Sequence, residues 1–503
     1  MSKSTNFEVF KIIWDKSPII VLDANILLDL YRYSADATED IINVLSNVNE
    51  QLWIPFQVKV EFNKNKDLIK KQQFNKYKNI PKEINSIIKT TLDSIGSKFF
   101  RYKQFHFPNI DILEHNIINN LNALSQQVSS FNDGINEEEI RNKNLLRNNI
   151  VEEFVEKIIS TGNIGREYNI LDLIKIYQEG EIRYKYLIPP GYMDAREKDD
   201  LTKFGDLIVW KQILEYAKFN NKEILFVTRD TKEDWWETSQ ENGQKVIVGP
   251  RNELIEEFDI FVQFNKHFNM ITLNELIPNL SKMLNINTIN TQLELDALDY
   301  IKVVFDGKVD GDFEREFQKY IDTIDPYQII DNSSRDINVI KLIDASVPNI
   351  TDVFVEFKEN EVIYNVEFKI HIKFNGFVNF DDERDDIYDI GIGIGTTQFR
   401  GNFSLSRNID YENDDLEDLD TDYENFLIDN IEVIESQFIE KDDLCIMCQE
   451  REGEYNYNDE GLICDYCYSH NDVATCTSCG RVLPWSNMGG DGFCKRCSPE
   501  YDY

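Results

Sequence analysis

The chain has 503 residues, a formal net charge of −38 and 42% hydrophobic residues. This length predicts two or three domains, and the hydrophobic content excludes a disordered chain. No apolar run is long enough to span a membrane and the N-terminus has no signal-peptide core, so we expect a cytoplasmic protein without membrane contact.

The charge is unevenly distributed along the chain. Residues 1–280 carry 42 acidic and 35 basic side chains, whereas residues 281–503 carry 49 acidic and 18 basic ones. This shift predicts a domain boundary near residue 285. The acidic C-terminal half repels nucleic acid and favours a basic protein partner, while the N-terminal half can still present a local basic surface.

A run of four apolar residues, 19–22, predicts a buried strand that ends at Asp23. Asn25 and the apolar residues after it predict a turn that enters a helix. A carboxylate at the carboxyl end of a buried parallel strand lies where open α/β sheets bind their ligands. The alternative is that Asp23 only caps the following helix.

A second short strand, residues 52–54, ends at Pro55 and leads into a helix that carries Glu61 near its start. The helix is rich in lysine, including Lys59 and Lys64. Such a surface suits phosphate neutralisation, and the alternative is a solvated helix face. Polar, mostly helical sequence continues as an insertion over about residues 65–185.

Two more carboxylates follow this insertion. Residues 204–214 predict a helix with Asp206 in its first turn, and residues 222–227 predict a second buried strand followed by Asp230. After a turn or helix at 233–236, residues 246–251 predict a third buried strand, and residues 270–280 a closing segment.

If these strands are parallel neighbours, Asp23, Glu61, Asp206 and Asp230 converge on one edge of the sheet. Four carboxylates at close range stay ionised only when cations neutralise them, and carboxylate oxygens suit Mg²⁺ or Mn²⁺. Ions held in this way activate water for phosphodiester cleavage, which is nuclease chemistry that needs no histidine. The alternative is helix capping combined with surface charge.

The sequences around these acids resemble the PIN-like nuclease domain, in particular its branch with a long helical insertion. The resemblance covers about residues 15–280 and rests on V-L-D-A-N-I-L-L-D-L, I-P-F-Q-V-K-V-E-F, P-P-G-Y-M-D-A, F-G-D-L-I-V-W and F-V-T-R-D-T-K-E-D-W-W. It implies an α/β fold with a Rossmann-like parallel sheet. It also implies cleavage of RNA, or less often of structured DNA.

By this resemblance, Asp23, Glu61, Asp206 and Asp230 are the catalytic metal ligands, and Asp234 is a candidate fifth acid. Asp194 is expected either to approach the site or to stabilise a turn. The expected substrate-binding and supporting residues are Asn25, Thr228, Lys59, Lys64, Lys211, Arg229 and Arg251. A structure-specific DNase and a zinc-finger adaptor with a degenerate nuclease domain are the alternative functions.

The acidic half is predicted to contain an α+β domain of unknown role at residues 285–408, with polar helices followed by alternating strands. Residues 409–440 are predicted to be an acidic linker, because like-charge runs are extended and solvated. Residues 1–284 would then form the nuclease domain, and residues 441–503 a small zinc-binding tail.

All eight cysteines of the tail lie in four C-x-x-C pairs, which indicate metal ligands instead of disulfides. The spacing predicts two structural Zn²⁺ sites in sequential pairs, with a cross-braced arrangement as the alternative. The units resemble tandem zinc ribbons that recruit a protein partner or the substrate. The predicted ligands are Cys445, Cys448, Cys464, Cys467, Cys476, Cys479, Cys494 and Cys497.

Overall fold

The computed structural model divides the chain into two compact units, Met1–Leu295 and Asp296–Tyr503. None of the described helices is long and apolar enough to cross a membrane. The structure describes residues 7–105, 109–141, 150–196, 198, 201–241, 244–263, 266–305, 309–330, 337, 339–381, 387–409, 423–458, 460–489 and 492–498.

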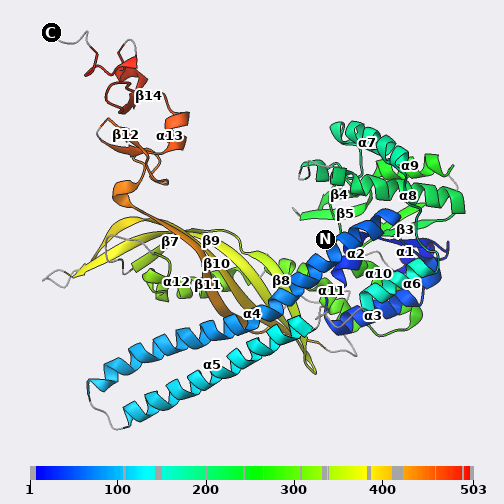
Figure 1. The fold of residues 1–503 in the computed structure, drawn as a ribbon, viewed down its shortest axis with the longest axis horizontal. Helices are drawn as coiled ribbons and strands as arrows, with labels where there is room; N and C mark the ends of the chain where they lie inside the picture. The colour runs from blue at the N-terminus through cyan, green and yellow to red at the C-terminus, as the bar shows by residue number, and fades with distance from the viewer. Residues whose placement is uncertain are drawn as a thin grey trace. The chain divides into compact units, whose positions relative to one another are not determined.

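The first unit is built on a four-stranded parallel sheet (Figure 1). Its strands, in the order in which they lie side by side, are β2 (Leu52–Trp53), β1 (Ile19–Leu22), β3 (Ile224–Val227) and β6 (Phe268–Ile271). All residues of β1 and β3 are buried, because these central strands are covered on both faces. The predicted Rossmann-like α/β fold is therefore confirmed.

Helices pack on this sheet and close a single apolar core, in which Trp210 contacts Phe258 and Phe268. The helices of this part of the unit are α1 (Phe7–Trp14), α2 (Ala24–Asp29), α3 (Ala35–Ser46), α6 (Ile150–Ser160), α7 (Ile170–Lys185), α8 (Gly205–Asn220), α9 (Asn252–Phe261) and α10 (Leu273–Leu284).

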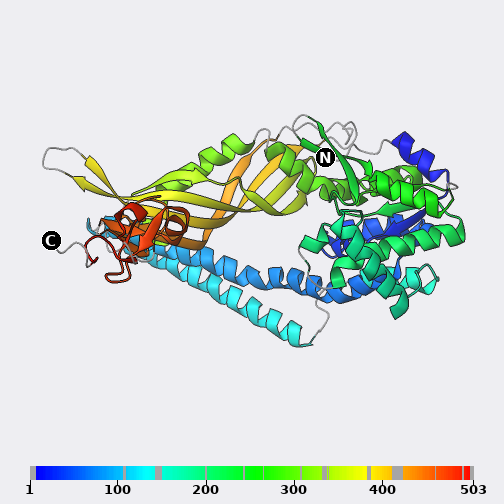
Figure 2. The ribbon, with the colours of Figure 1, turned by 90° about the horizontal axis from the view of Figure 1, so that it is seen from above.

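The predicted helical insertion is confirmed as a long antiparallel hairpin (Figures 1 and 2). Its two arms are α4 (Phe56–Lys103) and α5 (Ile110–Arg141). Between the arms, the rings of Tyr77 and Phe131 meet edge to face at 5.7 Å. Glu61 therefore stands at the root of a helix that continues far from the sheet.

The prediction of a third buried strand at residues 246–251 was wrong in its placement. Residues Gln244–Pro250 form β5, which pairs only with β4 (Trp236–Glu241) in an antiparallel hairpin. Val246 is buried but Val248 is 60% exposed, so the apolar run alternates between two environments. The fourth strand of the parallel sheet is β6, which begins just before the predicted closing segment.

The second unit contains a long antiparallel sheet in the order β11-β10-β9-β7, with β8 also pairing with β9. Apolar side chains on alternate positions of β9 and β10 pack against α12, where Phe313 contacts Phe368 and Phe403. Helix α11 (Ile289–Val304) begins in the first unit and ends in the second. The elements that follow are α12 (Asp310–Thr323), β7 (Val339–Ala345), β8 (Asn349–Phe357), β9 (Glu361–Asp381), β10 (Ile387–Asn408) and β11 (Phe426–Glu440).

Strand β11 corrects the prediction of an acidic linker over residues 409–440. It pairs with β10 along most of its length. Its apolar residues recur between acidic ones, and this alternation favours a strand over a solvated spacer. The most acidic part of the predicted linker, residues 410–422, lies outside the described residues.

The core of the parallel sheet should be intolerant of truncation at its centre. Phe226 of β3 is fully buried and stacks near Trp235 at 5.0 Å. We expect Phe226→Ala to lower the free energy of unfolding by about 3–5 kcal/mol, because it removes buried area and leaves a cavity. Urea denaturation of the full chain measures this loss, and exposed Phe219→Ala is the control, expected to cost well under 1 kcal/mol.

Candidate active site and metal-binding tail

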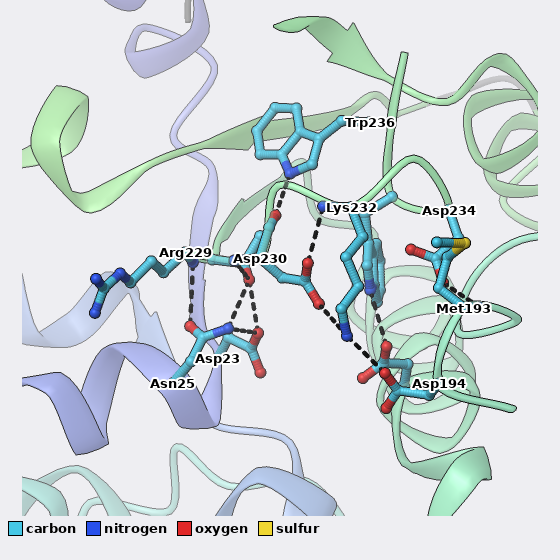
Figure 3. Close-up of polar contacts among 12 residues, drawn as sticks. Asp23, Asn25, Met193, Asp194, Arg229, Asp230, Lys232, Asp234 and Trp236 are labelled. Atoms are coloured by element: carbon cyan, nitrogen blue, oxygen red, sulfur yellow. Dashed lines mark hydrogen bonds and ion pairs between the residues drawn. The ribbon is translucent and has the colours of Figure 1, made fainter. Parts of the chain in front are cut away.

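Asp23 stands at the carboxyl end of β1, where the strand turns into α2. It is the N-cap of that helix, and its Oδ1 accepts a hydrogen bond of 2.7 Å from the backbone N–H of Ala24. Its Oδ2 accepts hydrogen bonds of 2.7 Å from both Asn25 Nδ2 and Thr228 Oγ1 (Figure 3). One oxygen of Asp23, Oδ1, therefore caps α2, and the other, Oδ2, is held by side chains of the candidate site.

The loop after β3 is tied to the turn after β1 by a small polar network. Asn25 Nδ2 donates to Thr228 Oγ1 at 3.0 Å, and the backbone N–H of Arg229 donates to Asn25 Oδ1 at 3.1 Å. The backbone N–H of Asp230 donates to Thr228 Oγ1 at 3.0 Å. The side chains of Asn25 and Thr228 thus fix Asp23 and Asp230 relative to each other, as supporting residues would.

Glu61 and Asp206 reach the same edge from helices. Glu61 Oε1 on α4 accepts a hydrogen bond of 2.8 Å from Gln57, one turn earlier. Asp206 is in the first turn of α8, and its Oδ2 accepts a hydrogen bond of 3.2 Å from Trp235 Nε1. A Cβ atom on Gly205 would lie 2.7 Å from Glu61 Oε1, so a glycine at this position leaves room for that carboxylate.

The electrostatics show that these carboxylates form one interacting cluster. Desolvation by the surrounding protein raises the pKa of Asp23 to about 7, and the charges of Glu61 and Asp230 add to this rise. Desolvation also raises the pKa of Asp206 well above its usual value, and repulsion from Asp194, Asp23, Asp230 and Glu61 contributes to this rise. The structure therefore brings together Asp23, Glu61, Asp206 and Asp230, which we call the acid cluster.

Asp194 adds a fifth carboxylate beside the acid cluster, together with two lysines that sequence reasoning missed. Burial alone would raise the pKa of Asp194, but hydrogen bonds from Lys198 and Lys232 hold it below its usual value. Lys232 Nζ lies 2.6 Å from Asp194 Oδ1 and 3.4 Å from Asp230 Oδ2 (Figure 3). The i,i+4 spacing of Asp194 and Lys198 was the sequence signal for one of these contacts.

Among the described residues, Asp234 forms no hydrogen bond with the cluster carboxylates, so its predicted role as a fifth acid stays a prediction. Its Oδ2 accepts a hydrogen bond of 2.9 Å from the backbone N–H of Met193, in the loop that carries Asp194. Its Oδ1 is buried without a hydrogen-bond partner among the described residues. Burial raises the pKa of Asp234, with a contribution from the charge of Asp230.

Three of the predicted phosphate contacts are engaged in ion pairs. Lys211 Nζ lies 2.8 Å from Glu179 and 3.0 Å from Glu257, and Arg229 Nη1 lies 2.8 Å from Asp29. Arg251 pairs with Glu253. Lys211 and Arg251 already form ion pairs within the protein. Their geometry therefore does not support contact with a phosphate.

Lys59 and Lys64 lie on α4, beside the acid cluster. Lys59 Nζ stands 5.9 Å from the centre of the Phe56 ring and is partly exposed. Lys64 is exposed, and its charge opposes the rise that desolvation causes in the pKa of Glu61. Lys64 is therefore both close to the acid cluster and open to solvent, as a phosphate-binding lysine must be.

Comparison with known protein families was made over the whole chain. Residues 19–254 match the family model described as a PIN like domain. These residues are a PIN-like domain. PIN-like domains are generally nucleases that need a divalent metal ion, so the match suggests a nuclease superfamily for residues 19–254. No curated protein and no solved structure matches the chain.

The acid cluster of the PIN-like domain fits a divalent cation. Its members repel one another and are partly desolvated, and such carboxylates are stabilised when a cation neutralises them. Among the described residues, only cysteine sets have three or more ligand atoms within 4.8 Å of one another. The oxygens of the acid cluster are therefore spaced more widely than the thiols of the tail.

The tail holds two groups of four cysteines, each within 4.8 Å, and this geometry supports the predicted sequential pairing. The first group flanks β12 (Tyr455–Tyr457), β13 (Gly461–Ile463) and α13 (Asp465–His470), and Cys464 caps that helix. The second flanks β14 (Val473–Thr475) and β15 (Val482–Pro484). Both groups are compatible with tandem zinc ribbons.

In each cysteine group the backbone favours the thiolate form of one member, while desolvation raises the pKa of Cys467 and a hydrogen bond with Cys494 raises the pKa of Cys497. Despite the opposing effect of desolvation, backbone hydrogen bonds lower the pKa of Cys445 to about 6. Backbone hydrogen bonds from Cys494 and Cys479 lower the pKa of Cys476 to about 6 as well. Each group can thus present a deprotonated thiol before the ion binds.

Asp206→Asn should stabilise the metal-free protein, and more so at higher pH. The pKa of Asp206 is raised on folding, so ionisation destabilises the native state progressively as pH rises above the unfolded-state value. Each unit of raised pKa is worth about 1.4 kcal/mol. Asparagine can still accept the Trp235 hydrogen bond. Urea denaturation in a chelator should show that the variant has a higher free energy of unfolding than the wild type at about pH 8, and that this difference disappears toward pH 4. A difference that is constant with pH, or of opposite sign, would contradict the repulsion.

The pairing of the cysteine groups can be tested by zinc content. A Cys445→Ser, Cys464→Ser variant should keep one ion, because both changes fall in one group. A Cys445→Ser, Cys476→Ser variant should keep none, because each group loses a ligand. Elemental analysis of the purified full chain measures both, and a cross-braced arrangement would give the opposite result.

Proposed function

We propose that the PIN-like domain is a metal-dependent endoribonuclease. The observation that carries this proposal is the acid cluster, in which carboxylates from four different elements meet at one edge of the parallel sheet, and in which desolvation and the charges of the other members raise the pKa of Asp23 and of Asp206. Burying several carboxylates together lowers the stability of the folded protein. A function that uses their charges therefore explains the acid cluster better than helix capping does. The family relation favours RNA as the substrate.

In this function Asp23, Glu61, Asp206 and Asp230 hold one or two Mg²⁺ or Mn²⁺ ions. Bound there, the ion lowers the pKa of a water molecule and stabilises the oxygens of an in-line phosphoryl displacement. The protein residues supply orientation: Asn25 and Thr228 fix the Asp23 carboxylate through its Oδ2.

Lys198 and Lys232 balance part of the cluster's negative charge through Asp194. Exposed Lys64 neutralises a phosphate of the substrate near the acid cluster.

The tail would hold two Zn²⁺ ions in structural sites that fold it. Beside the second cysteine group, the side chains of Trp485, Lys495 and Arg496 are exposed, and these residues suit recruitment of a protein partner or of RNA. We assign residues 1–284 to the nuclease domain, 285–440 to the α+β domain with β11, and 441–503 to the tail. Reduced thiols fit the cytoplasm.

Nuclease activity is testable with the purified full chain, Mn²⁺ or Mg²⁺, and end-labelled RNA and DNA, single-stranded and folded. We expect internal cuts in RNA that need the ion and stop on chelation. The Asp23→Asn, Asp230→Asn variant should lose more than about 100-fold in rate, since even residues that only orient metal ligands are worth 10–100-fold. Gel electrophoresis of time courses measures both.

Glu223→Gln is the matched control. Glu223 is also a buried acid, but it lies next to the amino end of β3, opposite the acid cluster, and bonds the backbone N–H of His267 at 2.7 Å. It should cleave at the wild-type rate. Cleavage by the double Asp variant at that rate would refute catalysis by the cluster. Cleavage of DNA alone would establish the DNase alternative. If none of the proteins cleaves RNA or DNA, the remaining hypothesis is the zinc-finger adaptor with a degenerate nuclease domain.

A further inference from the structure

One side of α4 carries a row of lysines that leads away from the acid cluster. The row consists of Lys64, Lys71, Lys78, Lys82 and Lys89. At about 100° per residue, these positions fall within about 40° of one another around the helix. We call these five residues the lysine ridge. It ends before Asp93, which lies on the same side of the helix.

Most of the ridge lysines remain available to bind a ligand. Four of them are exposed, and no ion pair among the described residues involves these four, namely Lys64, Lys71, Lys82 and Lys89. Lysines on other sides of α4 behave differently. Lys66 and Lys70 both pair with Glu152, and at the far end of the helix Lys103 pairs with Glu114.

The hairpin holds the ridge straight without covering it. On α4, Tyr77 contacts Phe131 of α5, and Asn85 accepts a hydrogen bond of 3.1 Å from Ser125 of α5. Tyr77 and buried Ile88 lie about 100–120° around α4 from the middle of the ridge, and Asn85 lies about 40° from it. The two helices run side by side in both views (Figures 1 and 2), so α5 braces α4, while four of the five ridge lysines are exposed.

The ridge is continuous with the acid cluster and has the dimensions of a nucleic-acid segment. Lys64 is three residues after Glu61, less than one helical turn away. From Lys64 to Lys89 the helix rises about 37 Å at 1.5 Å per residue. This length corresponds to about 11 base pairs of a B-form DNA duplex at 3.4 Å per pair, and to more pairs of an A-form RNA duplex, which rises less per pair. A chain with a net charge of −38 repels polyanions, so a row of lysines, four of which are exposed and form no ion pair among the described residues, favours one specifically.

We infer that the lysine ridge binds the phosphate backbone of a nucleic acid that extends from the acid cluster along α4. This inference rests on the proposed nuclease function, and it adds that the enzyme engages substrate well beyond the bond it cleaves. Backbone contacts of this kind carry no sequence information. The ridge therefore selects substrates by length and by a continuous backbone. Short fragments, which reach only the acid cluster, bind weakly and leave.

The test measures binding without cleavage. Full-length Asp206→Asn protein in a chelator is given fluorescent RNAs, single-stranded and duplex, of about 8 and about 30 units, over a range of salt. The ridge variant adds Lys71→Glu, Lys82→Glu and Lys89→Glu, which spares Lys64 beside the acid cluster. The matched control adds Lys157→Glu, Lys175→Glu and Lys222→Glu, three exposed lysines of the same unit outside α4, with the same change in charge.

We expect the ridge variant to bind the long RNA at least about tenfold more weakly, with the salt slope reduced by about 2–3 because three phosphate contacts are lost. The short RNA should bind as before, and the control variant should behave as its parent. Equal affinity of ridge and control variants for the long RNA would overturn the inference, as would failure of the parent to bind RNA or DNA. Tighter binding by the ridge variant would also overturn it, and would show that an acidic part of the protein occupies the ridge.

The same proteins separate this inference from the proposed function. If the wild-type chain cleaves nothing while the parent still binds long RNA through the ridge, the nuclease proposal fails and the binding surface stands. If the wild-type chain cleaves RNA but the ridge and control variants bind alike, the nuclease stands and the ridge fails.

Discussion

The first unit is organised around mutual repulsion of carboxylates that the fold holds together. Parallel pairing of β1 with β3 brings Asp23 and Asp230 to one edge, and the starts of α4 and α8 add Glu61 and Asp206. Desolvation, together with repulsion from Glu61 and Asp230, raises the pKa of Asp23 to about 7, so the ionised cluster is unfavourable without a cation. The apolar core beneath must offset that cost, which explains why the central strands are so completely buried.

The folded protein can accommodate the acid cluster because neighbouring residues restrict the movement of its carboxylates and offset part of their negative charge. The Asn25–Thr228 network gives Asp23 Oδ2 two donors and leaves little freedom to rotate away. On the other side, Lys232 lies between Asp194 and Asp230 and partly compensates both. Because the negative charge is only partly offset, the protein can fold while the site keeps a net negative charge. That net negative charge is what allows a metal ion to bind.

The parts of the site that could be predicted are those encoded by local pattern. Runs of four apolar residues fixed β1 and β3, because strands buried on both faces have no polar side. The strand at residues 246–251 was misplaced because three β-branched residues do not reveal whether both faces are covered. Lys232 escaped notice because its contact with Asp194 joins two loops 38 residues apart. Strand β11 was missed because its acidic residues concealed the alternation.

Charge segregation gives the chain a way to act on a polyanion while remaining strongly acidic. Diffuse negative charge over the second unit opposes indiscriminate association with nucleic acid, since such association grows with the number of accessible cations. A lysine ridge that is straight, braced by α5 and continuous with the acid cluster overcomes that barrier only for a backbone lying along it. Affinity then depends on several phosphates being engaged together, so each contact can be weak and the cleaved fragments still separate. The rigid hairpin therefore sets substrate length, and the acid cluster sets the point of cleavage.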